Sequence, residues 1–133
     1  MVAQDYLNEI YMEGQIDWLS FGYLGGWVGH DPEVSGPEKS DLDIFNDTLH
    51  LIGYLVQIGD FEAGHIVVRN GCGDFVVYSD GFSEFAENAK KHFKEEGLRC
   101  PDLMWVLGIK KILLNKPAPE VSDSIAKLFW LPE

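Results

Sequence analysis

The sequence predicts a single α+β domain in which helices pack on a small antiparallel sheet that contains a β-hairpin. Two segments, 41–58 and 82–96, repeat apolar residues at helical spacing. Between them, Asn70-Gly71 separates two short segments rich in β-branched and aromatic residues, which is typical of a hairpin turn. The chain has 133 residues, of which 46% are hydrophobic. This length suits one hydrophobic core, so we assign residues 1–133 to a single domain.

A short helix is predicted at the N-terminus, over about residues 2–13. Leu7, Ile10 and Tyr11 share one face of this helix, and acidic residues occupy the other positions. Gly14 is expected to end the helix, because glycine is a poor helix former and is common just past a helix end.

Residues 16–28 are dense in large apolar side chains, and glycines interrupt the segment at positions 22, 25, 26 and 29. The glycines lack the spacing of a phosphate-binding loop, and no basic residue accompanies them. We interpret the segment as aromatic side chains packed around a tight backbone. Residues 30–40 contain two prolines, a glycine and three acids, and they are predicted to form an exposed loop.

The clearest helix prediction covers residues 41–58. Ser40 is a favoured N-cap residue, and a carboxylate follows at Asp43, where it can reach back to the cap or favour the positive helix end. Gly59 can adopt the left-handed conformation that closes a helix. The stripe predicted to face the core comprises Leu42, Phe45, Leu49, Ile52, Leu55 and Val56.

A β-hairpin and a further helix are predicted next. Residues 64–69 and 74–78 read as its strands, joined by a turn at residues 70–73. The helix covers residues 82–96 and ends at Gly97. Its predicted core-facing residues are Phe82, Phe85, Ala86, Ala89 and Phe93.

The C-terminal part is predicted to hold strands and a last helix. Residues 103–107 and 109–114 are the strand candidates. A Pro-rich connector, 115–119, leads to a C-terminal helix over about residues 120–129, with Pro119 suited to its first turn.

The charge distribution is lopsided. Residues 1–68 contain twelve carboxylates and one base, Lys39, whereas residues 69–133 contain ten acids and nine bases. The first half therefore carries eleven of the twelve net negative charges. Such a field repels itself and attracts groups of opposite sign, so it favours a basic protein partner. It argues against nucleic acid and anionic membranes, which are bound through Lys and Arg.

The predicted partner-binding residues are the carboxylates in and around the 41–58 helix. Two of them, Asp43 and Asp47, are one helical turn apart on a face expected to be exposed. A solvated acidic surface with no partner is an equally open interpretation. The predicted set comprises Glu33, Glu38, Asp41, Asp43, Asp47, Asp60 and Glu62.

No catalytic residue, metal site or cofactor is predicted. The four histidines show no paired spacing, and neither cysteine has a histidine within four residues, so local ligand clusters for zinc are absent. Calcium would require a loop of alternating acidic ligands that the sequence lacks. Cys72 and Cys100 are interpreted as reduced thiols of a cytoplasmic protein, and the N-terminus has no secretory-signal pattern.

One block of the sequence resembles part of a known protein family. The block is Phe45-Asn46-Asp47-Thr48-Leu49-His50-Leu51-Ile52-Gly53-Tyr54-Leu55-Val56-Gln57-Ile58-Gly59-Asp60-Phe61. Together with the hairpin that follows, it resembles a bacterial family of small acidic proteins over residues 42–78. Some members of that family are immunity proteins of contact-dependent growth inhibition. The resemblance implies a non-enzymatic, cytoplasmic protein that binds one cognate toxin domain, often a nuclease with a basic cleft.

Two other functions remain open. The chain can be a small enzyme or ligand-binding domain whose pocket is lined by Trp18, Tyr23, Trp27 and Tyr54. A helix followed by a hairpin is also the topology of a winged-helix regulator. The net charge of −12 argues against that regulator, because DNA contact depends on neutralising phosphates.

Overall fold

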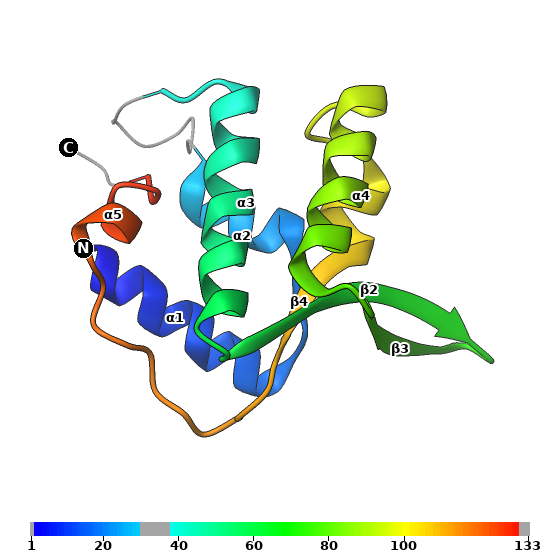
Figure 1. The fold of residues 1–133 in the computed structure, drawn as a ribbon, viewed down its shortest axis with the longest axis horizontal. Helices are drawn as coiled ribbons and strands as arrows, with labels where there is room; N and C mark the ends of the chain where they lie inside the picture. Colours follow the sequence, from blue (N-terminus) through cyan, green and yellow to red (C-terminus); the bar gives the residue numbers. More distant parts are fainter. Residues whose placement is uncertain (1, 30–37, 131–133) are drawn as a thin grey trace.

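The computed structural model describes residues 2–29 and 38–130, and it confirms the α+β class (Figure 1). Four antiparallel strands form one sheet in the order β1-β4-β2-β3. The elements in chain order are α1 (Ala3–Ile16), β1 (Leu19–Ser20), α2 (Phe21–Val28), α3 (Asp41–Gln57), β2 (Phe61–Arg69), β3 (Cys72–Val77), α4 (Gly81–Glu96), the short π-helix η1 (Asp102–Val106), β4 (Leu107–Lys111) and α5 (Asp123–Ala126).

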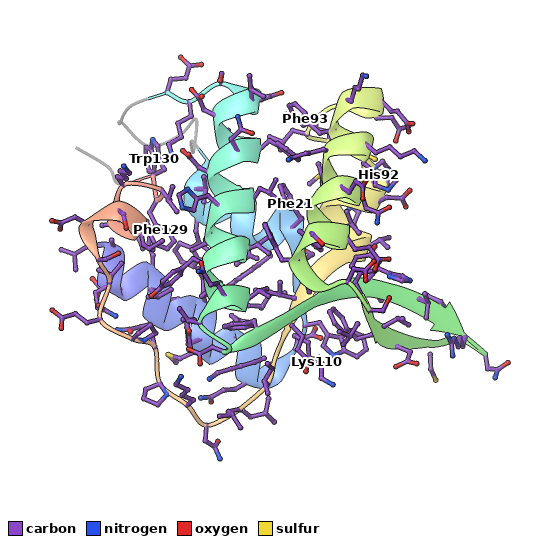
Figure 2. The ribbon with its side chains drawn as sticks, viewed as in Figure 1. Phe21, His92, Phe93, Lys110, Phe129 and Trp130 are labelled. Atoms are coloured by element: carbon purple, nitrogen blue, oxygen red, sulfur yellow. The ribbon has the colours of Figure 1, made fainter. Side chains whose placement is uncertain are left out.

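Helices α3 and α4 stand side by side on the sheet, and the hairpin β2–β3 extends away from the body of the domain (Figure 1). Aromatic rings fill the space between the two helices. Phe45 of α3 stacks on Phe93 of α4 at 4.4 Å between ring centroids, and Phe21 of α2 lies 5.5 Å from Phe45 (Figure 2). Because offset and stacked rings bury large apolar areas, this contact joins three helices into one core.

The central helix begins and ends as predicted. The Ser40 side-chain oxygen accepts a hydrogen bond from the Asp43 amide at 3.1 Å, and Gly59 has a φ of +83°. The predicted core residues Phe45, Leu49, Ile52 and Leu55 are buried. Leu42 was wrongly placed on this stripe: its side chain is 55% exposed, because a residue in the first turn lies beyond the edge of the core.

Helix α1 runs two residues beyond the predicted end at Gly14. This glycine is buried, and a Cβ atom there would lie 3.2 Å from the Phe61 ring. Gly14 therefore permits close packing of α1 on the sheet and does not end the helix. The predicted inward face of Leu7, Ile10 and Tyr11 is confirmed.

The glycine-rich segment forms a helix, α2, which the sequence interpretation missed. The Ser20 hydroxyl caps it by accepting a hydrogen bond from the Tyr23 amide at 3.1 Å. Gly22 lies directly against η1, where a Cβ atom would come within 2.6 Å of the Met104 carbonyl oxygen. The glycine serves a close helix contact, which is a property of the tertiary structure and has no local pattern.

The hairpin is confirmed, with a tighter turn than predicted. Only Asn70 and Gly71 form the turn, with φ angles of +52° and +80°, and Arg69 pairs with Cys72. Two positive φ angles give the strand twist that a two-residue hairpin requires. Helix α4 is also confirmed, with its predicted inward residues in or against the core.

The C-terminal part differs from its prediction. Residues 102–106 form η1 and not a strand, and the second strand candidate is realised as β4, Leu107–Lys111. The last helix is shorter than predicted and begins after Ser122, so Pro119 lies outside it. The connector 115–119 has no helix or strand, and most of the predicted loop lies outside the described residues.

No helix among residues 2–29 and 38–130 is both long enough and apolar enough to cross a membrane.

Truncating the buried face of α3 should destabilise the domain. We expect Leu49→Ala to lower the free energy of unfolding by about 2–5 kcal/mol, because it removes buried apolar atoms and leaves a cavity. The matched control is Leu42→Ala on the same helix, which should cost less than about 0.5 kcal/mol because Leu42 is mostly exposed. Urea midpoints measure both, and equal midpoints for the two variants would contradict this packing.

Candidate partner-binding surface

Three of the predicted carboxylates are exposed at the start of α3. These are Glu38, Asp41 and Asp43, which lie within six consecutive residues of the sequence. Asp41 and Asp43 lie in the first turn, where negative charge is favourable near the positive end of the helix dipole. Their position therefore has a structural explanation besides any partner. Glu33 lies outside the described residues.

Asp47 is engaged within the chain. Its carboxylate lies 3.0 Å from the Lys39 ammonium, which also donates a hydrogen bond to the Leu128 carbonyl oxygen at 2.8 Å. Lys39 is the one base of the first half, so its charge is used to hold residue 39 against α3 and the C-terminal segment. Asp47 is half-buried by this arrangement and contributes less to an open acidic surface.

Asp60 is not on the surface, so its place in a docking surface was predicted wrongly. Its side chain is 2% exposed and accepts hydrogen bonds from the Tyr11 hydroxyl at 2.5 Å and from the Lys116 ammonium. A buried carboxylate is stable only when it is paired and hydrogen-bonded, and both conditions hold here. Asp60 has a structural role.

Lys111 lies next to this carboxylate and is also 2% exposed. Its ammonium donates hydrogen bonds to the carbonyl oxygens of Leu114 and Lys116 at 2.9 and 2.5 Å, and it lies 4.9 Å from the centre of the Tyr11 ring. Burial lowers the pKa of Lys111, and the nearby Asp60 carboxylate partly offsets this effect. We call Tyr11, Asp60 and Lys111 the buried polar cluster; Lys116, which pairs with Asp60 at its edge, is 46% exposed.

Glu62 faces a base across the sheet. It lies directly opposite Lys110 in the antiparallel pairing of β2 with β4, so the two side chains share a face of the sheet. Opposite charges at this separation reduce the local negative field. Glu62 is half-buried, and it adds little to an acidic surface.

The outer face of α1 carries an acidic surface that the sequence interpretation left out. Asp5, Glu9 and Glu13 recur every four residues and are exposed, and the exposed apolar residues Met12 and Ile16 lie on the same arc of the helix. Ile16 is 80% exposed. We call these five residues the α1 face. The four-residue spacing of its acids is visible in the sequence, but the predicted partner-binding set contains only carboxylates in and around residues 41–58.

The acids at the C-terminal end of α1 destabilise that helix. Glu13 lies in its last turns and Asp17 is its C-cap, and α1 has no basic residue in its last turn. Negative charge there meets the negative end of the helix dipole, and Glu9 and Glu13 repel each other one turn apart. Asp17 accepts a hydrogen bond from the Trp18 amide at 2.7 Å, whereas Glu9 and Glu13 have no such contact among the described residues.

Two half-buried aromatic residues of α2 lie beside the α1 face. Burial raises the pKa of the Tyr23 hydroxyl, a hydrogen bond with Trp27 lowers it, and the negative charges of Glu13 and Glu9 raise it. Trp27 packs on Tyr23 at 6.4 Å and on Tyr6 of α1 at 4.8 Å. The acidic surface thus continues into aromatic side chains.

The four aromatic residues predicted to line one pocket do not converge: Tyr23 and Trp27 pack on each other, but Trp18 and Tyr54 lie at two other places. Trp18 packs on Phe75 of the hairpin at 5.8 Å, whereas Trp27 packs on Tyr6 of α1. Tyr54 lines a cleft of about 520 Å³ together with His50 and Phe82, and the described lining of that cleft does not include the other three.

A larger cleft of about 840 Å³ lies between α2, the start of α3 and η1. The glycines of α2 form one wall, and Asp41 and Arg99 are the charged residues among its described lining. A small ligand with both charge signs would fit these walls.

Compared with models of protein families, with curated proteins and with solved structures, the chain matches none. The resemblance to immunity proteins of contact-dependent growth inhibition therefore stays a prediction.

Replacing Tyr11 by Phe should make stability less sensitive to alkaline pH. Burial and the hydrogen bond to Asp60 raise the pKa of Tyr11 above its ordinary value of 10.0. Above that pH the unfolded chain loses a proton that the folded chain keeps, so stability present below it is lost as pH rises.

The expected extra slope is at most about 1.4 kcal/mol per pH unit for one proton. Urea midpoints of the wild type and Tyr11→Phe, measured between about pH 9 and 11, test this slope. The variant is expected to be less stable at neutral pH but to lose less stability on the alkaline side. Parallel curves for the two proteins would contradict the assignment.

Proposed function

We propose that the chain is an immunity protein that binds and neutralises a cognate toxin domain through its acidic surface. The observation that carries the proposal is the α1 face, where Glu9 and Glu13 are exposed one turn apart and no basic residue balances the C-terminal end of the helix, an arrangement expected to cost stability. Surfaces that give up stability in this way are typical of functional sites.

Most of the negative charge that the first half carries in residues 2–29 and 38–68 is not paired with a base. Among residues 2–29 and 38–130, only Asp47 and Asp60 of the first-half acids form ion pairs. Seven others are exposed and unbridged: Asp5, Glu9, Glu13, Asp17, Glu38, Asp41 and Asp43. An open field of one sign steers a partner of opposite sign and raises its association rate.

The apolar residues of the α1 face can supply binding affinity, which exposed charges alone provide only weakly. Met12 and Ile16 are exposed between the carboxylates, and Trp27 of α2 is half-buried against Tyr6 nearer the start of α1. Buried apolar and aromatic contacts at the centre of an interface carry most of the affinity, while surrounding charges set rate and specificity. A nuclease with a basic, phosphate-binding cleft is the toxin class that such a surface fits, and the proposed site of action is the cytoplasm.

Charge reversal tests whether the partner binds the α1 face or another acidic surface of the chain. Three tagged proteins are used to capture partners from lysates of the source cells at low salt, and mass spectrometry identifies what is captured. They are the wild type, the α1 variant Glu9→Lys/Glu13→Lys and the α4 variant Glu87→Lys/Glu95→Lys. The two variants have the same net charge, and Glu87 and Glu95 are exposed on α4. We expect a basic protein with the wild type and the α4 variant and its loss with the α1 variant.

With that protein purified, the α1 variant should associate about tenfold more slowly or worse, with a weaker dependence on salt. Co-expression should then show that it no longer protects cells. Equal capture and equal association rates for both variants would overturn the α1 face. Loss with Glu38→Lys/Asp43→Lys alone would instead place the surface at the start of α3.

The α1 variant should fold at least as stably as the wild type. Lys at position 13 is favourable near the C-terminal end of α1, and reversal of both residues only replaces one like-charge pair by another. We expect a gain of about 0.3–1 kcal/mol in the free energy of unfolding. A large loss in the urea midpoint would show that these acids support the fold, and the functional interpretation would lose its basis.

The alternative is a small-ligand-binding domain, favoured by the 840 Å³ cleft with Asp41 and Arg99 on its walls. The same capture experiment separates the two functions. A ligand-binding domain would recover no basic protein with any variant, and Arg99→Ala would then be the variant that removes ligand-induced thermal stabilisation.

A further inference from the structure

Three potential metal ligands converge where α4 ends and η1 begins. The side chains of His92, Cys100 and Asp102 each offer a ligand atom, and these atoms all lie within 4.8 Å of one another. His92 lies on the side of α4 that faces away from α3, whereas its neighbour Phe93 points between the two helices (Figure 2). The cluster is therefore separate from the aromatic core and from the α1 face.

The backbone turns sharply to produce this convergence. Gly97 ends α4 with a φ of +80°, and the Cys100 amide donates to the Gly97 carbonyl oxygen at 3.3 Å. The chain then enters η1, whose first residue is Asp102. A single π-helical turn is rare and is often found at functional sites. The spacing of eight residues and then two matches no common zinc motif, which is why the sequence predicted no metal.

The three side chains do not satisfy one another by hydrogen bonds. The His92 Nδ1 atom and the Asp102 Oδ2 atom are 3.9 Å apart, which is too long for a hydrogen bond. Two ligands of one tetrahedral zinc ion are separated by about 3.3 Å, given metal–ligand bonds near 2.0 Å. Small side-chain movements would therefore bring these atoms onto a shared ion.

Burial of the thiol and exposure of the other ligands suit an ion that enters from solvent. Cys100 is 1% exposed, while Asp102 is exposed and His92 is half-buried. The Cys100 thiol donates to the Glu96 carboxylate at 2.8 Å.

We propose that His92, Cys100 and Asp102 bind a zinc-class divalent ion. Thiolate, imidazole and carboxylate together are a ligand set for Zn²⁺, whereas magnesium and calcium prefer oxygen alone. On binding, the metal–sulfur bond replaces the sulfur–hydrogen bond, and the proton leaves through Glu96 to solvent. Glu96 contacts the thiol but does not converge with the other two ligand atoms, so the fourth tetrahedral position is left to a solvent water molecule.

Cobalt(II) is the probe, because tetrahedral cobalt with a thiolate ligand absorbs in the visible range and shows sulfur-to-metal charge transfer in the near ultraviolet. The full chain is reduced, freed of metal and titrated with cobalt, and zinc is then added to displace it. We expect one equivalent of cobalt with the charge-transfer band, and loss of the band when zinc is added.

Matched variants assign the ligands. Cys100→Ser should lose the charge-transfer band, whereas Cys72→Ser should keep it, because Cys72 is exposed on the hairpin. If Cys100→Ser does not fold, His92→Ala and Asp102→Asn test the site from its accessible side. Each should weaken zinc binding by about tenfold or more, while His50→Ala on the exposed side of α3 should not.

Absence of the charge-transfer band in the wild type would overturn the proposal. Loss of the band in Cys72→Ser with its retention in Cys100→Ser would overturn it too. The same holds for zinc affinities of His92→Ala and Asp102→Asn equal to that of the wild type.

Discussion

The packing of α1 on the sheet depends on the buried polar cluster of Tyr11, Asp60 and Lys111, together with Lys116 at its exposed edge. These groups come from α1, the start of β2, the end of β4 and the segment that follows it. Removing the Tyr11 hydroxyl would leave the buried Asp60 carboxylate without one of its donors, and an unsatisfied buried acceptor typically costs about 1–3 kcal/mol. Apolar contacts alone would tolerate a helix that slides or rotates slightly, whereas this cluster requires one position of α1.

That fixed position decides which residues of α1 face outward. Each residue advances the helix by about 100°, so pointing Tyr11 and Gly14 inward leaves Glu9, Glu13 and Ile16 in solvent. A rotation that hid Ile16 would move Tyr11 away from Asp60. The apolar exposure of the α1 face is thus a consequence of the interior polar contacts and gains nothing for the fold itself.

The elements that the sequence predicted correctly are those with local signals. Ser40 and Gly59 mark the ends of α3, Gly97 marks the end of α4, and Asn70-Gly71 defines the hairpin through its positive φ angles. The errors occurred where a distant contact decides the structure. Gly22 and Gly14 serve close approaches to Met104 and Phe61, and the burial of Asp60 depends on Lys116, which is 56 residues away. The convergence of His92 and Cys100 likewise requires the turn at Gly97, and the spacing of the two residues in the sequence does not predict that turn.

The acidic half of the chain combines carboxylates with three different physical roles. Asp41 and Asp43 stabilise the start of α3, and Asp47 and Asp60 are paired with lysines, so these four need no partner to explain them. Glu9, Glu13 and Asp17 are different, because each is exposed, unbridged and placed where the helix dipole or a neighbouring charge disfavours it. Net charge treats all of these residues alike, although only the last group costs stability. The case for a basic partner therefore depends on these three carboxylates and the apolar residues beside them, and not on the total of −12.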